Sequence, residues 1–198
     1  MMILVYITQK RNVQIGKERK LMKKTPNIRK MIITAMCIAL CVVLPMAVHA
    51  IPNAGSIFSP MHIPVLLCAL ICGWHYGLFC GLAGPFLASL ITGMPPMAYL
   101  PSMLVELAVY GLVTGLMIQV IRTKKIYVNL YASLIIGMIV GRLVAGLAQA
   151  AVFSGGGYTM TMWVTSYFIT AWPAIVIQLA VLPTLVYALQ KARLISIG

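Results

Sequence analysis

Five long apolar stretches decide what this chain can fold into. They cover residues 31–50, 61–93, 99–121, 128–153 and 164–189. A helix needs about 20 mostly apolar residues to cross the hydrocarbon of a bilayer. Residues 61–93 are too many for one crossing, and the turn-like sequence Gly73-Trp74-His75-Tyr76-Gly77 divides them in the middle. The pattern therefore predicts an all-α membrane protein with six transmembrane helices.

The positive charges lie mainly in the connections and predict the orientation. The chain has 15 Lys and Arg against two Asp or Glu. Nine of these cations precede residue 31, three lie in residues 122–125 and two in residues 191–193. Because Lys and Arg are enriched in cytoplasmic loops, we expect these regions on one side, with both the N- and C-termini cytoplasmic. The remaining connections carry no charge and are expected outside; they are residues 51–60, 94–98 and 154–162.

Three regions are expected along the chain. Residues 1–27 form a basic cytoplasmic extension that we expect to be disordered, residues 28–193 the six-helix transmembrane domain, and residues 194–198 a short cytoplasmic tail. Met22 is an alternative start within the extension. Val48-His49-Ala50 also fits a signal-peptidase site behind a basic flank and an apolar stretch, an alternative that the charge pattern leaves open.

The composition excludes several kinds of chemistry. Hydrophobic residues make up 62% of the chain, and Glu18 and Glu106 are its only carboxylates, so catalysis by paired carboxylates lacks its parts. No GxxxxGK[ST], HExxH or GxSxG motif is present. The five cysteines lie in apolar stretches without a CxxC pair, which indicates packing residues. We expect no catalytic residue, no metal, no cofactor and no nucleic-acid partner.

Two ionisable residues fall within predicted spans, where such groups are costly and imply a partner or a ligand. Glu106 lies about 7 to 8 Å beyond Pro101, and Arg142 about 20 Å from the inner end of its helix. Both are therefore expected in the outer half of the membrane domain. Either they neutralise each other between helices, or Arg142 is the counter-ion of a ligand carboxylate, which its planar fork matches.

Other polar and aromatic residues are expected at the same level. Aromatic walls, a few hydrogen-bonding groups and one cation are what a pocket for a small nutrient requires. Trp172 is expected to lie deeper than the other aromatic residues, which also suit a belt at the membrane interface. The predicted substrate-binding residues are Arg142, Glu106, Asn53, His62, Tyr99, Gln149, Tyr158, Trp163, Tyr167 and Trp172.

Pairs of small residues four positions apart mark sites where membrane helices approach closely, and internal packing explains most of them. The pairs are Ala35/Ala39, Gly77/Gly81, Gly111/Gly115 and Gly137/Gly141.

Several short sequences together resemble a known family. They are the Ala35/Ala39 pair, Ser59-Pro60-Met61-His62-Ile63-Pro64-Val65-Leu66-Leu67, the turn at residues 73–77, Gly81-Leu82-Ala83-Gly84-Pro85 and Thr92-Gly93-Met94-Pro95-Pro96. With the basic start and the six predicted spans, residues 28–193 resemble the S component of energy-coupling factor (ECF) vitamin transporters, the substrate-binding membrane subunit of an ABC-type importer.

The resemblance implies a ligand site, partners and a location. In that family the ligand lies in the outer half under the first, third and fifth connecting loops, and the AxxxA face of the first helix contacts a membrane coupling subunit driven by two ATPase subunits. Ala35 and Ala39 would then contact the coupling subunit. The protein would lie in the plasma membrane of a prokaryote. The resemblance also implies that the loaded subunit topples in the membrane and releases its ligand inside.

Three functions follow as hypotheses. The first is capture of a small water-soluble vitamin, with Arg142 favouring pantothenate or nicotinate over riboflavin or a pyridoxine-like compound. The second is an integral membrane enzyme that uses Glu106 or a histidine as base. The third is a structural membrane subunit without a ligand.

Overall fold

The computed structural model describes residues 28–48, 59–121, 123, 125–152, 161, 164–165, 169 and 171–192. Six helices, and no strand, are formed by these residues. The helices are α2 (Ile28–Val48), α4 (His62–Cys72), α5 (Trp74–Thr92), α6 (Leu100–Val120), α7 (Ile126–Val152) and α9 (Trp172–Lys191).

Most of these helices match the length of a bilayer crossing. In the described part of the chain, five helices are long and apolar enough to span a membrane, and α4 is the shorter sixth. Its 11 residues rise about 16 Å, roughly half the thickness of the hydrocarbon. The prediction of an all-helical membrane protein is therefore confirmed, while a full crossing by α4 stays a prediction.

Gly73 divides the second apolar stretch, as the sequence predicted. Its φ of 92° lies in a region that glycine adopts readily and other residues avoid. The Gly73 N–H donates to Ala69 O at 3.0 Å at the end of α4, and Gly73 O accepts from the Gly77 N–H at 3.0 Å at the start of α5. One residue thus ends one helix and begins the next. The chain reverses direction there without a longer loop.

The helix α9 as described is shorter than the apolar stretch from which it was predicted. We predicted a span from Val164; α9 is described from Trp172 and has Pro173 in its first turn, where the first N–H groups of a helix have no partner in any case. Val164 is itself helical, so where the membrane crossing begins stays a prediction.

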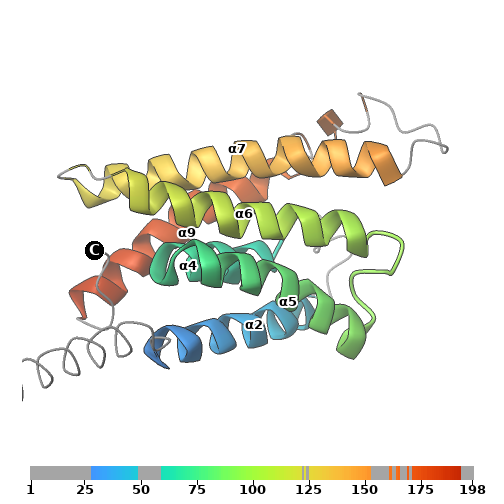
Figure 1. Ribbon diagram of the computed structural model, residues 1–198, viewed down its shortest axis with the longest axis horizontal. Coiled ribbons are helices and arrows are strands. Elements are labelled where there is room, and N and C mark those ends of the chain that lie inside the picture. The colour runs from blue at the N-terminus through green and yellow to red at the C-terminus, as the bar shows by residue number, and fades with distance from the viewer. Residues whose placement is uncertain are drawn as a thin grey trace, which may run out of the picture.

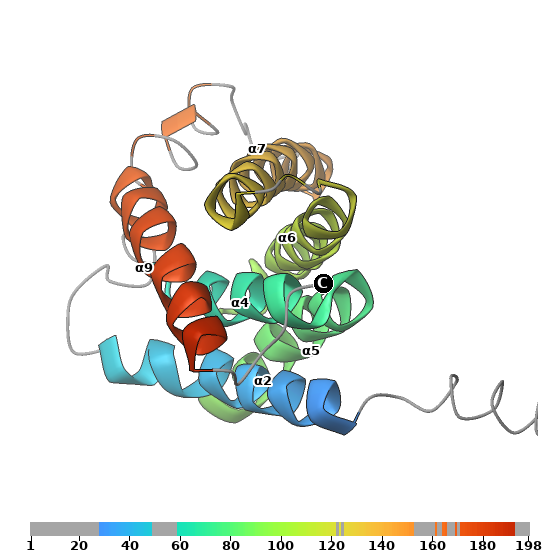
Figure 2. The same ribbon diagram turned by 90° about the vertical axis from the view of Figure 1, so that its left-hand side faces the viewer.

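The helices form a bundle with two distinguishable ends (Figure 1). The start of α2, the α6–α7 connection and the end of α9 lie at the left of Figure 1 and carry Lys30, Lys125 and Lys191. The rings of Tyr127 and Tyr187 lie 5.1 Å apart there and join α7 to α9. We call this the cationic end. The opposite end holds the end of α5, residues 93–99, the start of α6 and the end of α7 (Figure 1). Figure 2 looks onto the cationic end.

Glycines allow α5, α6 and α7 to pack closely. A Cβ added at Gly77 or Gly81 would meet the backbone of α6, and one added at Gly111 would meet the backbone of α5 at Gly77. In α7, a Cβ at Gly137 would meet Thr114 and one at Gly141 would meet the ring of Tyr110. These pairs serve internal packing, as the sequence indicated.

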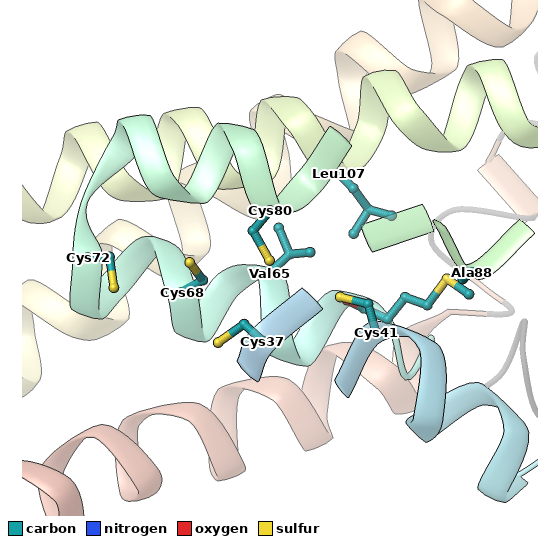
Figure 3. Packing of buried hydrophobic residues seen from close by; sticks show 9 residues of the cluster. Cys37, Cys41, Val65, Cys68, Cys72, Cys80, Ala88 and Leu107 are labelled. Carbon is teal, nitrogen blue, oxygen red and sulfur yellow. The ribbon is translucent and has the colours of Figure 1, made fainter. Parts of the chain in front are cut away.

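The cysteines pack between α2, α4 and α5 (Figure 3). All five are buried and carry free thiols. They form a core cluster with Val65, Ala88 and Leu107, among other residues. The Cys72 Sγ donates to Lys30 O at 3.7 Å, and Lys30 Nζ donates to Cys72 O at 3.2 Å. These two hydrogen bonds join α2 to the end of α4 at the cationic end. The interpretation of the cysteines as small packing residues is confirmed by their burial.

Ala35 and Ala39 differ from the glycine pairs because both are exposed. They share the outer side of α2 with large apolar side chains, all of them exposed: Met31, Ile32, Met36, Leu40, Val43 and Met46. Within the described bundle this face has no protein covering it. It can contact lipid or another membrane protein.

Candidate functional site

The chain's intramembrane carboxylate is bonded to a histidine. His62 is the first residue of α4, and Glu106 lies in the second turn of α6. The His62 Nε2 lies 3.3 Å from Glu106 Oε1, and the two side chains are only 7% and 12% exposed. The distance is at the long end for a hydrogen bond, and the low-dielectric interior strengthens the interaction relative to water. This contact ties the start of α4 to the second turn of α6.

Tyr110 extends this polar contact one turn deeper. Its side chain is 1% exposed, and its ring packs edge-on against the His62 ring with centroids 5.2 Å apart. Tyr110 and Glu106 are four residues apart on α6, so they lie on one face of the helix. Both Glu106 and Arg142 lie close enough to Tyr110 to interact with it electrostatically. His62, Glu106, Tyr110 and Arg142 therefore form one group, which we call the polar cluster.

Arg142 enters the polar cluster from α7. Its side chain is 4% exposed, and its neighbour Gly141 packs directly against the Tyr110 ring. Arg142 lies ten residues, or about 15 Å, before Val152 at the end of α7, while Glu106 lies about 9 Å after the start of α6. Both helix termini belong to the opposite end. The two charged residues therefore lie in the half of the bundle that is farther from the cationic end.

The charge of this interior constrains its chemistry. Arg142 retains its positive charge in a protein, and burying it costs several kcal/mol unless oxygen atoms surround it. Its guanidinium has five N–H donors arranged in a fork that suits a carboxylate. In the described part of the chain, no group of three or more His, Cys, Asp or Glu side chains is placed to hold a metal ion. The guanidinium therefore requires oxygen-bearing or anionic partners, which the protein or a ligand can supply.

The partner that the structure gives for Glu106 is His62, which begins α4 beside the second turn of α6. The Glu106–Arg142 ion pair weighed from the sequence stays a prediction. Gly141, the neighbour of Arg142, packs against Tyr110, one turn further along α6. Arg142 and Glu106 both lie close to Tyr110.

The other predicted binding residues separate into three groups. Gln149 is partly buried on α7, two turns beyond Arg142 toward the opposite end. Tyr99 and Trp172 are 54% and 61% exposed. Trp172 is the first residue of α9, and its depth in the membrane stays a prediction. Asn53, Tyr158, Trp163 and Tyr167 lie outside the described residues.

Tyr110 and Gln178 are among the buried polar residues that we did not single out in the sequence. Tyr110 and Gln178 are each 1% exposed, in α6 and α9. Both lie within apolar stretches, where a tyrosine passes for a packing aromatic residue and a single glutamine for a surface position. The available signal was the spacing of Tyr110 four residues after Glu106, which places the two on one helix face.

The fold and the polar cluster define a helical membrane protein with a polar interior in one half and cations at the other end. A family model described as "ECF transporter, substrate-specific component" matches residues 29–187. The chain belongs to this family of transporter subunits, which the resemblance of its sequence had indicated. Comparison with curated proteins gives no significant match. As a member of the family, the chain is a substrate-specific component that works with the coupling and ATPase subunits of an importer.

Proposed function

We propose that this chain captures a small water-soluble vitamin with high affinity and that the vitamin carries a carboxylate. Pantothenate and nicotinate are favoured over riboflavin and pyridoxine-like compounds. The observation that carries the proposal is the burial of Arg142 within the polar cluster. A buried guanidinium beside hydrogen-bonding side chains offers a carboxylate a bidentate partner in a low-dielectric environment, where such a pair is stronger than in water.

The proposal includes an orientation. The cationic end faces the cytoplasm, the chain crosses the membrane six times with both termini inside, and the polar cluster lies in the outer half. The enrichment of Lys and Arg in cytoplasmic connections supports this orientation. A ligand from outside would then reach Arg142 without passing the cationic end. The membrane is proposed to be the plasma membrane of a prokaryote.

Contact with the coupling subunit is proposed for the exposed outer face of α2. Ala35 and Ala39 are small and exposed there, whereas the glycine pairs of α5, α6 and α7 are used inside the bundle. Small residues allow another membrane helix to approach closely. The family match favours vitamin capture over the enzymatic and the ligand-free structural hypotheses.

Ligand identification tests the proposal. The full chain, purified in lipid nanodiscs, is denatured and the released small molecules are identified by mass spectrometry. Binding of pantothenate, nicotinate, riboflavin and pyridoxine to ligand-free protein is then measured by calorimetry. We expect one carboxylate-bearing vitamin to bind at a 1:1 ratio with nanomolar affinity. A folded protein that binds none of the four and releases no vitamin contradicts the proposal, and binding of a neutral vitamin alone contradicts the preference for an anion.

A further inference from the structure

Gln178 is a buried amide without a hydrogen-bond partner. The side chain is 1% exposed on α9, and neither its Nε2 nor its Oε1 is bonded to any part of the chain that the structure describes. Leaving a buried polar atom without a partner costs about 1–3 kcal/mol, whereas an apolar side chain of the same shape carries no such cost. A leucine would therefore be favoured at this position if packing were its only role.

The position of Gln178 links it to the polar cluster. It shares one face of α9 with Ile175, Leu179 and Leu182, which pack into the core that also contains Leu66 of α4 and Tyr110 of α6. Gln178 lies in the second turn of α9, on the helix face that packs into this core. Gln178 thus faces the interior on the side where α4 and Tyr110 contribute to the same core.

Two further buried atoms of the polar cluster lack hydrogen-bond partners among the described residues. They are His62 Nδ1 and the Tyr110 hydroxyl; the hydroxyl interacts with Glu106 and Arg142 but makes no hydrogen bond of good geometry to them. The rings that carry them are in edge-to-face contact, so the two atoms belong to neighbouring side chains. The His62 ring nitrogen Nδ1 is thus a second polar atom of the imidazole, besides the Nε2 that contacts Glu106. Three helices contribute buried polar atoms without a hydrogen bond to the described residues.

The hydrogen-bonding capacity of these groups defines which part of a ligand can bind them. A primary carboxamide presents a donor and an acceptor side by side, and its natural partner is another amide, urea or lactam edge. His62 Nδ1 accepts or donates according to the tautomer of the ring, and a tyrosine hydroxyl both donates and accepts. We propose that Gln178, supported by His62 Nδ1 and the Tyr110 hydroxyl, binds an uncharged amide-like edge of the captured molecule and determines specificity for it.

This inference rests on the proposed function and narrows its substrate class. The ligand must carry an amide, urea or lactam group in addition to the carboxylate that Arg142 binds. Of the two favoured vitamins, pantothenate has an amide N–H and carbonyl between its hydroxylated end and its carboxylate. Nicotinate has a ring nitrogen that only accepts. The geometry therefore favours pantothenate or another amide-bearing acid.

The test replaces Gln178 by leucine and compares two ligands. Pantothenate and an ester analogue, in which oxygen replaces the amide N–H, are titrated into wild-type, Gln178→Leu and Gln190→Leu protein in nanodiscs. Gln190→Leu is the matched control because it makes the same change on the same helix near the cationic end. Unfolding of the ligand-free proteins is followed by circular dichroism, to detect a purely structural effect.

We expect the wild type and the control to prefer pantothenate over the ester by about tenfold to a hundredfold, the effect of one or two lost buried hydrogen bonds. Gln178→Leu should lose this preference and bind both ligands about equally weakly, with unchanged or higher stability without ligand. Unchanged affinity and preference in Gln178→Leu overturn the inference, as does a loss of stability that weakens the binding of both ligands equally.

If the wild type binds only a vitamin without an amide-like edge, the inference alone fails. If it binds no vitamin, the proposed function fails and the inference with it.

Discussion

His62 Nε2 lies 3.3 Å from Glu106 Oε1, across the interface between the start of α4 and the second turn of α6. The contact joins residues that are 44 positions apart in the chain. It gives the carboxylate a partner in an interior where an isolated charge is costly. It also orients the His62 ring so that its other face meets Tyr110. One hydrogen bond therefore positions much of the polar cluster.

Removal of the histidine should destabilise the protein even without ligand. His62→Ala leaves the Glu106 carboxyl buried without the imidazole, which should lower the free energy of unfolding by about 1.5–3 kcal/mol. Glu106→Gln should recover part of this loss in the double variant, because it removes the unpaired charge, and a double-mutant cycle in detergent measures the coupling. His75→Ala is the control, since His75 is exposed near the cationic end. Equal unfolding curves for His62→Ala and the wild type would show that the pair contributes nothing to stability.

Replacement of the buried arginine should affect charged ligands selectively. Arg142→Lys keeps the charge but loses the fork, and Arg142→Gln loses both. We expect the affinity for the carboxylate vitamin to fall about tenfold or more in Arg142→Lys and further in Arg142→Gln, with little change for an amidated, neutral analogue. Calorimetric titration of both ligands measures this difference. Parallel losses for the charged and the neutral ligand would rule out a counter-ion role.

Filling the close contact between α5 and α6 should weaken the fold. Gly111→Leu places a side chain against the backbone of Gly77, where neither helix can yield without moving apart. Overpacking of this kind costs about 1–3 kcal/mol. We expect Gly111→Leu to unfold at a lower temperature than the wild type and to bind the vitamin less tightly. Ala188→Leu, an exposed position on α9, is the control and should match the wild type. A fully stable Gly111→Leu would mean that α5 and α6 do not pack as closely as described.

A larger side chain on the outer face of α2 should leave the fold intact but weaken binding of the coupling subunit. Ala39→Leu changes an exposed residue, so folding and vitamin binding of the isolated chain should stay at the wild-type level. Co-purification with the coupling subunit should fall, because a bulky side chain prevents close approach of a partner helix. Ala188→Leu again serves as the control. Retention of the whole complex by both Ala35→Leu and Ala39→Leu would exclude this face as the contact.

The elements themselves could largely be predicted from the sequence. The apolar stretches are long enough to be recognised without knowledge of their neighbours, and Gly73 marks the break between α4 and α5. The start of α9 at Trp172 could not be predicted in the same way, because the apolar pattern continues from Val164 without a break and hydropathy does not mark helix boundaries.

The site could be predicted less well, for a physical reason. Membrane helices are apolar on all sides, so periodicity does not distinguish the face toward the protein from the face toward lipid. Glu106 and Arg142 were found because charge is rare in such helices. Tyr110 and Gln178 were missed because neutral polar residues are common there, and only packing shows that both are buried. The His62–Glu106 contact depends on how α4 meets α6, which no local pattern encodes.

A ligand-bound experimental structure tests the central claim most directly. The chain, saturated with the vitamin that it carries or binds, would be solved by electron cryomicroscopy with a rigid binding partner, or by crystallography. We predict the ligand in the half of the bundle away from the cationic end, with its carboxylate within about 3 Å of Arg142. A ligand bound at the cationic end, or on a lipid-facing surface with Arg142 contacting protein alone, would contradict the account.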